Sequence, residues 1–241
     1  MKCLLSVCLI ALLAVAIGHV VEQSAKASQE SAPAMQQGVS VKMASANSAQ
    51  PMPEANNADA WIVTVSADGQ LYFGVDAVTP ATLRDRIIHT YTHTPHRRGQ
   101  KLYIKADARA PFASVQKALD AASEAAFESP VLLVNQPGPV SPGMMVAPKG
   151  LEITMDGAAT SGTKSVVEVN YSGQGSPTSK IDDQEVALAA VQDRLHQLVT
   201  SRNEKTILLR ADARSRFGDV AQVIDACRAA GAIVVVATPV V

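Results

Sequence analysis

The chain has little of the chemistry on which enzymes and metal sites depend. Only three of its 241 residues are cysteines, and two of these, Cys3 and Cys8, fall in an apolar stretch at the amino terminus. The third, Cys227, stands alone, so the sequence allows no internal disulfide framework and no zinc site of the Cys-x-x-Cys or Cys/His kind. A Gly-x-Ser-x-Gly motif, a phosphate-binding loop and a spaced carboxylate pair are also missing. We therefore expect a protein that is not an enzyme and that has no cofactor.

The chain also lacks an excess of positive or negative charge. The sequence has 21 Lys and Arg residues against 22 Asp and Glu residues, for a formal net charge of −1. A strongly charged polymer is attracted by a large net charge of opposite sign, so we expect no nucleic-acid partner. Aromatic residues make up only 4%, but an apolar fraction of 47% in 241 residues is enough for one or two packed domains.

The amino terminus contains no acidic residue before Glu22. A lysine at position 2 precedes an uncharged apolar run, and small residues follow, which is the layout of a signal peptide in residues 1–27. The small residues predict cleavage either after Gly18 or after Ala27. The other interpretation is an N-terminal membrane anchor, because residues 3–21 as a helix would measure ~28 Å, close to the ~30 Å of a hydrocarbon core. Both interpretations place the remaining chain in the cell envelope, either anchored in the inner membrane or secreted to the periplasm.

Residues 28–59 contain few aromatic or β-branched side chains. Ala, Ser, Gln, Asn, Pro and Met dominate this stretch, and its apolar residues show no helical or strand periodicity. Such a composition is typical of a chain that cannot bury enough surface to offset its conformational entropy. We therefore expect a disordered linker that gives the folded part reach away from the amino-terminal segment.

One pattern occurs twice with a constant offset of 105 residues. Residues 101–115 and 206–220 each contain an apolar strand, the sequence Ala-Asp-Ala-Arg, an aromatic residue and the start of an amphipathic helix. Phe112 of the first copy corresponds to Phe217 of the second. Matches in register at this many positions indicate a duplicated domain.

Each copy belongs to a unit whose predicted order is β-β-α-β-α-β. The fold class is therefore α/β (α+β), with two tandem domains at residues 60–137 and 150–241. A cluster of proline and glycine predicts a linker at residues 138–149. We expect each domain to contain a small mixed sheet and two helices.

Local patterns predict further details of the two domains. In the first, residues 70–75 are expected to form the second strand of a hairpin. In the second, residues 151–155 are expected to pair in a hairpin with residues 166–171. Asp182 and Glu185 have the spacing of a capping box, which predicts the start of a helix.

The Ala-Asp-Ala-Arg sequences supply the candidate partner-binding residues. Asp107 and Arg109 in the first copy correspond to Asp212 and Arg214 in the second. In one interpretation, each Asp–Arg pair recognises an anion or a peptide segment. In the other, each carboxylate accepts hydrogen bonds from its own turn or pairs with its arginine, which fixes the strand-to-helix corner. We favour the structural role, because it explains why the sequence is present in both copies.

A histidine cluster in the first domain is a weak candidate for a metal site. His89 and His93 are four residues apart and share one face of a predicted helix, a spacing that suits a metal ion. Pro95 is expected to end this helix before His96, and no carboxylate or cysteine joins the cluster. We favour a basic helix terminus that complements the helix dipole. The basic residues of this domain predict a solvated face, with a contact to peptidoglycan or to an acidic partner segment as the alternative; they are Arg84, Arg86, Arg97, Arg98, Lys101 and Lys105.

The order of these motifs resembles the periplasmic domain of the ExbD/TolR family. The shared features are a hairpin with an Asp-Gly turn, an apolar strand ending in Ala-Asp, a nearby aromatic residue, a Val-x-x-apolar-x-Asp-Ala helix and a final apolar strand. The resemblance is clearest over residues 61–134 and 206–238. It implies an accessory subunit of inner-membrane motors, with ExbB/TolQ-like or TonB-like partners. Family members dimerise through this domain, which implies an intramolecular pseudo-dimer or a homodimer here.

One departure from the family pattern concerns proton coupling. Family members carry an aspartate in their membrane helix, whereas residues 3–21 here contain no acid, and a proton relay in a membrane needs an ionisable group. We expect a cell-envelope accessory protein that resembles the ExbD/TolR component of proton-motive-force-coupled transport systems. It would act through protein–protein contacts in the periplasm. The alternative is a secreted periplasmic binding module, for peptidoglycan or a small ligand, that is not coupled to a motor.

Overall fold

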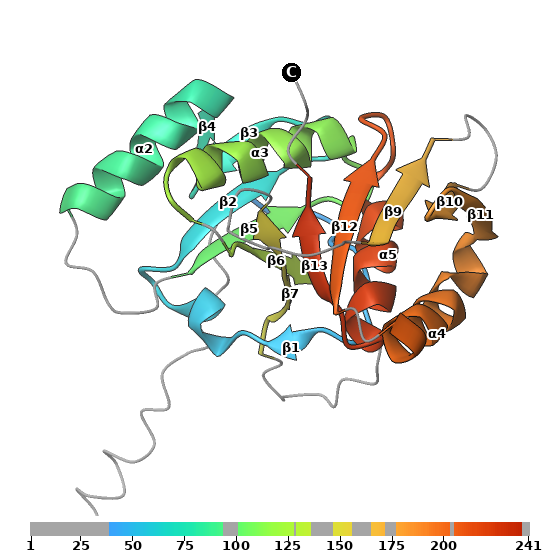
Figure 1. Ribbon diagram of the computed structural model, residues 1–241. Helices are drawn as coiled ribbons and strands as arrows, with labels where there is room; N and C mark the ends of the chain where they lie inside the picture. Colours follow the sequence, from blue (N-terminus) through green and yellow to red (C-terminus); the bar gives the residue numbers. More distant parts are fainter. Residues whose placement is uncertain are drawn as a thin grey trace, which may run out of the picture. The chain divides into compact units, whose positions relative to one another are not determined.

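The computed structural model describes residues 39–93, 101–127, 129–135, 147–155, 165–171, 177–202 and 205–237 (Figure 1). All of these residues belong to one compact unit, residues 35–241. The predicted signal peptide or anchor, residues 1–27, lies outside the described residues. Within the described ranges, no helix is both long enough and apolar enough to span a membrane.

The described chain forms two mixed β-sheets. The first contains, in spatial order, β1 (Gln50–Pro51), β7 (Lys149–Glu152), β6 (Val131–Val134), β5 (Leu102–Ala106), β2 (Trp61–Val65), β3 (Leu71–Phe73) and β4 (Asp76–Val78). The second contains β11 (Gln184–Ala187), β10 (Thr178–Ile181), β9 (Ser165–Asn170), β12 (Thr206–Ala211), β13 (Ile233–Val236) and β8 (Thr154–Met155). In both sheets the duplicated strand, β5 or β12, is central and parallel to both of its neighbours.

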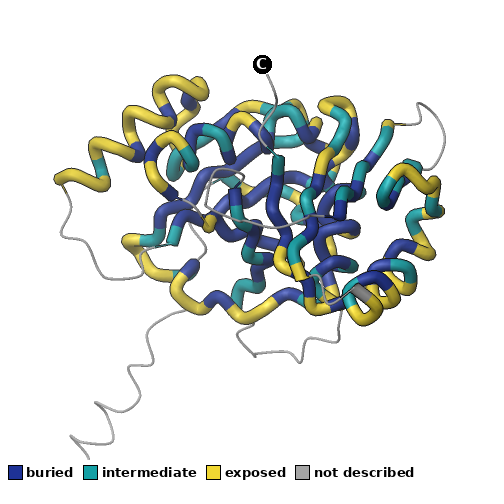
Figure 2. The backbone as a smooth tube through the Cα atoms, in the orientation of Figure 1, coloured by how far each residue is buried: buried dark blue, intermediate teal, exposed yellow. Residues whose placement is uncertain are grey.

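Two α-helices accompany each sheet in the described chain. They are α2 (Pro80–His93) and α3 (Phe112–Glu124) in the first half, and α4 (Val191–Arg202) and α5 (Phe217–Ala229) in the second; η1 (Pro53–Asn56) and η2 (Leu188–Ala190) are short 3₁₀ helices. The predicted α/β fold class with two halves is confirmed. The central strands are buried, whereas α2 exposes most of its outer side (Figure 2).

Alternation along β5 shows how the first sheet is covered on both faces. Ile104 belongs to the hydrophobic cluster that includes the helices, while its neighbour Tyr103 belongs to a second cluster on the opposite face. Successive strand residues point to opposite faces, so the two clusters lie on the two sides of the sheet. Met52 and Ala55, from the chain before β2, are part of the second cluster. The amino-terminal part of the described chain therefore covers this face.

The predicted disordered linker at residues 28–59 is wrong for its described part, residues 39–59. Residues 50–51 form β1 and residues 53–56 form η1. Buried alanine and methionine side chains anchor the stretch; they are Ala44, Ala46, Ala49, Met52 and Ala55. Small and unbranched side chains can lie flat on a sheet face without periodicity of their own, and the composition gave no sign of this.

The hairpin predicted for residues 151–155 and 166–171 is also wrong. Residues 149–152 form β7, which pairs antiparallel with β6 of the first sheet, and residues 154–155 form β8, which pairs parallel with β13 of the second. The strand that pairs with β9 in a hairpin is instead β10. The first sheet thus takes a strand from the chain that follows the predicted linker.

Two turns differ from the predicted ones. The strand expected at residues 70–75 ends at Phe73, because Gly74 adopts φ +64° and reverses the chain into β4. Asp182 does not cap a helix. It and Asp183 have φ values of 47° and 66° and form the tight turn between β10 and β11, since two-residue hairpin turns of the type I′ class need left-handed backbone at both positions. Among the described residues, three strands (β2 to β4) lie between residue 60 and α2, and five (β7 to β11) lie between residue 149 and α4. Two were predicted in each place.

Candidate functional site

The Asp107 turn, residues 107–111, connects β5 to α3. Asp107 accepts a hydrogen bond from the backbone N–H of Arg109 (N–Oδ1 3.0 Å) and two from the Arg109 side chain (Nε–Oδ1 2.8 Å and Nη2–Oδ2 3.0 Å). The side chain of Asp107 is only 3% exposed, whereas that of Arg109 is 64% exposed. The carboxylate thus holds its own turn, and the guanidinium lies at the surface.

The Asp212 turn, residues 212–216, repeats this arrangement between β12 and α5. Asp212 accepts from the backbone N–H of Arg214 (2.9 Å) and from its side chain (Nε–Oδ1 3.2 Å and Nη2–Oδ2 3.1 Å). The Arg214 guanidinium also lies over the ring of Tyr171, 5.0 Å from its centroid, a favourable cation–π geometry. The contacts predicted for a turn-fixing carboxylate are present in both copies. A role in partner binding remains a prediction.

Hydrogen bonding lowers the pKa of both carboxyl groups. The Arg109 side chain holds the pKa of Asp107 well below its usual range, and the Arg214 side chain lowers the pKa of Asp212. A hydrogen bond to the charged form favours that form. Both groups are therefore anionic acceptors at neutral pH.

The two turns contact each other with reciprocal backbone hydrogen bonds. Phe112 N–H donates to the Ser215 carbonyl (2.8 Å), and its counterpart Phe217 N–H donates to the Ala110 carbonyl (2.9 Å). Phe112 corresponds to Phe217 and Ala110 to Ser215, so the contact obeys a local two-fold relation. Such a self-complementary contact is the hallmark of an isologous interface. Here it joins two halves of one chain.

A second reciprocal pair brings the two helix starts together. Ala113 N–H donates to the Ala213 carbonyl (3.0 Å), and Gly218 N–H donates to the Ala108 carbonyl (2.8 Å). A Cβ on Gly218 would lie 3.0 Å from the carbonyl oxygen of Ala108, closer than an ordinary contact. Glycine at this position therefore permits the close approach of the two backbones.

Asp225 on α5 fixes the amino-terminal segment of the described chain. Its two carboxylate oxygens accept from the backbone N–H groups of Asn47 and Ser48, each at 2.8 Å, and it also accepts from the Ser48 hydroxyl. Its counterpart Asp120 has a different environment: the amide of Gln116 donates to it (2.9 Å), and burial raises its pKa. The repeat pattern pairs the two aspartates, but nothing in it indicates that only one of them binds this distant segment.

The histidine pair does not gather further ligands in the described part of the chain. His89 and His93 stack with their ring centroids 4.1 Å apart, and the His93 Nδ1 lies 2.8 Å from the His89 carbonyl oxygen. No group of three or more His, Cys, Asp or Glu side chains suited to a metal ion occurs among the described residues. His96 lies outside them.

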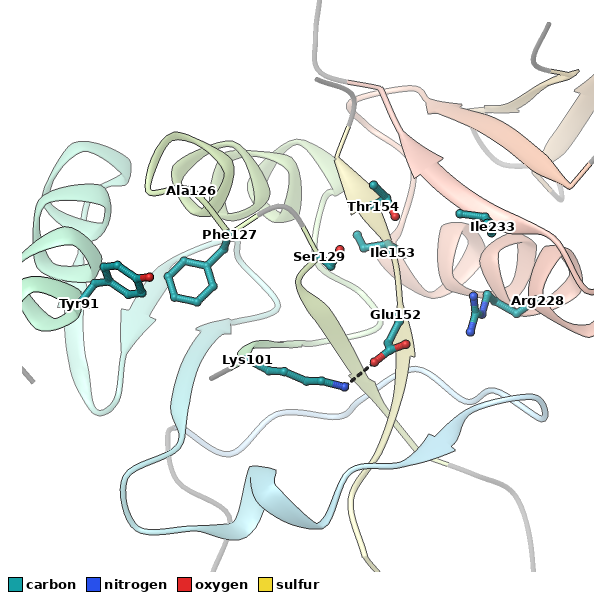
Figure 3. Close-up of a pocket in the computed structure, with 10 residues that line it drawn as sticks. All are labelled: Tyr91, Lys101, Ala126, Phe127, Ser129, Glu152, Ile153, Thr154, Arg228 and Ile233. Atoms are coloured by element: carbon teal, nitrogen blue, oxygen red, sulfur yellow. Dashed lines mark hydrogen bonds and ion pairs between the residues drawn. The ribbon is translucent and has the colours of Figure 1, made fainter. Parts of the chain in front are cut away.

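A pocket of about 460 Å³ lies where the chain crosses from the first sheet to the second (Figure 3). One wall is aromatic: the rings of Tyr91 and Phe127 meet edge to face with centroids 5.8 Å apart. Lys101 and Glu152 form an ion pair in the pocket, and Arg228 of α5 lies beyond Glu152 (Figure 3). The remaining lining residues are Ala126, Ser129, Ile153, Thr154 and Ile233. The sequence gave no sign of this pocket, because its lining comes from segments far apart along the chain.

One family model matches both halves of the chain. A family model described as biopolymer transport protein ExbD/TolR matches residues 27–138 and, a second time, residues 134–238. The two matches together cover residues 27–238, so the chain belongs to the ExbD/TolR family. The predicted family and its duplication are confirmed. Neither curated proteins nor solved structures gave a match.

Proposed function

We propose that this protein is a non-enzymatic accessory component of a proton-motive-force-coupled transport system of the cell envelope. The observation that carries the proposal is the double match to the biopolymer transport family. The proposed partners are ExbB/TolQ-like motor subunits or a TonB-like protein, met in the periplasm. Residues 3–21 contain no acidic side chain, so a carboxyl group for a membrane proton relay in this system would have to come from a partner subunit.

The paired halves support an action through protein contacts. A dimer of single-domain subunits would need two chains to form a two-fold interface, whereas the reciprocal bonds between residues 110–113 and 215–218 provide one within a single chain. We propose that this intramolecular pseudo-dimer is the active form, with one chain taking the place of two.

Two strand edges are the proposed contact surfaces. Among the described strands, β4 pairs only with β3, and β11 pairs only with β10. Ala77 on β4 and Glu185 on β11 are exposed. An open edge presents unpaired backbone donors and acceptors to which a partner strand can add.

Photo-crosslinking in intact cells tests this proposal. A photoreactive amino acid in place of Ala77 or Glu185 is expected to crosslink the protein to a motor subunit or to a TonB-like protein. The exposed Lys117 of α3 is the matched control position, away from both edges, and is expected to give no such product. Crosslinks that form equally from all three positions, or that contain no envelope transport protein, would contradict the proposal.

The pocket at the crossing supports a second candidate function, that of a secreted module for a small ligand. Its aromatic wall, with Arg228 on the opposite side (Figure 3), suits a ligand that has both an apolar part and a negative charge. Intact mass of the exported protein separates the two candidates. Loss of the first 18 or 27 residues rules out an anchored motor subunit, and a retained amino terminus rules out the secreted module.

A further inference from the structure

The Asp107 turn holds a strand of the same chain. Lys42 N–H donates to Asp107 Oδ2 (3.0 Å), and Ala108 N–H donates to the Lys42 carbonyl (2.8 Å). Met43 and Asp107 form an isolated antiparallel bridge. The turn thus offers one acceptor and one donor to a single residue of an extended segment, in the manner of a short added strand.

The Asp212 turn presents the same carboxylate acceptor and backbone N–H donor, but no extended segment of the described chain binds them. Ala213 corresponds to Ala108, is exposed, and its N–H donates to no acceptor among the described residues. Asp212 Oδ2 accepts only from Arg214 there, although a carboxylate oxygen has room for two donors. The side chain of Asp212 is 29% exposed, against 3% for Asp107.

The sheet faces beside the two turns differ in the same way. In the first sheet, Ile62 and Tyr103 are 1% and 2% exposed, because the segment that begins at Lys42 continues across them. The corresponding residues of the second sheet are Val166 and Leu208, and both are only half-buried. An apolar strip therefore runs beside the Asp212 turn and has no such cover among the described residues.

The chain's own equivalent segment is used elsewhere. Residues 147–152 follow residues 42–47 by 105 positions, and they are the natural candidates to reach the Asp212 turn. Instead, residues 149–152 form β7 of the first sheet, and the Pro148 carbonyl accepts a hydrogen bond from Met52 N–H (2.6 Å). Both segments therefore belong to the first sheet, and no equivalent segment of the described chain contacts the Asp212 turn.

We propose that the Asp212 turn is the binding site for an extended peptide segment of a partner protein. One residue of this segment donates its N–H to Asp212 and accepts from Ala213 N–H, as Lys42 does at the first turn. The next residue is apolar and packs on Val166 and Leu208, as Met43 packs on the cluster of Ile62 and Tyr103. A small anion does not fit, because the Asp212 carboxylate repels it and Arg214 is already paired.

The proposal deepens the one above and rests on it only for the identity of the partner. The contact itself is tested with purified components. The probe is a fluorescent peptide of residues 39–48 of this chain, which contains the Lys42–Met43 pair known to fit such a turn. Its binding to the full-length protein is measured by fluorescence anisotropy.

The variant Ala213→Pro removes the N–H donor and keeps the turn. Ala213 is the second residue of a β-turn closed by the hydrogen bond from Ser215 N–H to the Asp212 carbonyl (2.9 Å), a position at which proline is favoured. We expect at least a tenfold loss of peptide affinity. The matched control Ala108→Pro alters the first turn and is expected to leave binding at the second turn within threefold. Thermal melting of both variants shows whether either fails to fold.

Three outcomes would overturn the proposal. The full-length protein does not bind the peptide at millimolar concentration; or a folded Ala213→Pro variant binds it unchanged; or Ala108→Pro abolishes binding, which means that the peptide replaces Lys42 at the first turn. If Ala213→Pro fails to fold, Asp212→Ala takes its place with the same expectation. Failure here leaves the crosslinks from β4 and β11 unaffected, so the two proposals can fail separately.

Discussion

The two halves share a turn but not a surface. The Asp107 turn and the Asp212 turn have the same internal hydrogen bonds within about 0.4 Å, and they meet in a reciprocal contact. The first is covered by residues that precede its own domain, and the second is open in the described chain. Duplication therefore preserved the corner that builds the interface, while the segments around it became specialised. The differences between the halves, more than their likeness, indicate where a partner can bind.

The largest difference is expected at the two aspartates of the second helices. Asp225→Ala leaves the N–H groups of Asn47 and Ser48 without their carboxylate acceptor and should lower the free energy of unfolding by about 3 kcal/mol, since bonds to charged groups are the stronger ones. Asp120→Ala should cost less than about 1 kcal/mol, because only the hydrogen bond from the Gln116 side-chain amide is lost. Urea denaturation measures both. Equal losses would contradict the assignment of Asp225 as the residue that fixes the amino-terminal segment.

The two turns should differ next. Asp107→Asn is expected to cost about 2 kcal/mol at pH 7, because a buried carboxylate that accepts hydrogen bonds from Lys42 and Arg109 loses its charge. Asp212→Asn at the surface should cost less than about 1 kcal/mol. The pKa of Asp107 is lowered by Arg109. The contribution of the ionised Asp107 carboxylate to the free energy of unfolding is therefore present above the unfolded-state pKa of about 4. It is lost as the pH falls toward the folded-state pKa.

Denaturation at a series of pH values checks this prediction. The difference in stability between the parent protein and Asp107→Asn should shrink steadily below about pH 4. A difference that stays constant from pH 7 to pH 2.5 would mean that the charge of Asp107 does not stabilise the turn. The Asp212→Asn variant serves as the control for general effects of acid.

A substitution at the start of α5 alone should disturb the close approach of the two helix starts. Gly218→Val places side-chain atoms against the Ala108 carbonyl, which a Cβ already approaches to 3.0 Å, and should cost about 1–2 kcal/mol by overpacking. Ala113→Gly, at the corresponding position of the first half, removes only a methyl group and should cost less. Thermal unfolding by calorimetry measures both. The reverse order would mean that the two backbones are not in contact at this point.

The smallest effect is expected at Cys227, whose counterpart in the first half is Ala122. Cys227 is fully buried, and burial raises the pKa of its thiol to about 12. In a protein with Cys3→Ser and Cys8→Ser, it should not react with a thiol reagent at pH 8 until the protein is unfolded. Cys227→Ala should cost about 1 kcal/mol. Rapid labelling of the folded protein would show that this helix does not pack as described.

Local patterns predicted the duplicated corner well. The strand, the Ala-Asp-Ala-Arg turn and the helix that follows are short-range features, and Asp107 and Asp212 hold their turns as a short polar side chain is expected to. The aromatic residues at positions 112 and 217, which correspond in the two copies, are both buried in the core.

Contacts between residues far apart in the sequence could not be predicted from local patterns. The register of β7 against β6 and the contact of Asp225 with Ser48 join residues far apart in sequence, and nothing local to either partner specifies the other. Residues 39–59 looked disordered because alanine and methionine cover a sheet without a period of their own. Asp182 resembled a helix cap because the same residue types favour caps and tight turns.

Amide hydrogen exchange, followed residue by residue by NMR, is the most direct test of the central claim. The claim is that the two turns pair and that, within the described chain, a segment occupies the first turn and not the second. The N–H groups of Phe112 and Phe217 should be protected together, because they donate to each other's turns. Ala108 N–H should be protected by Lys42, and Ala213 N–H should exchange freely. Protection of Ala213 equal to that of Ala108, or free exchange at Phe112 and Phe217, would contradict the account.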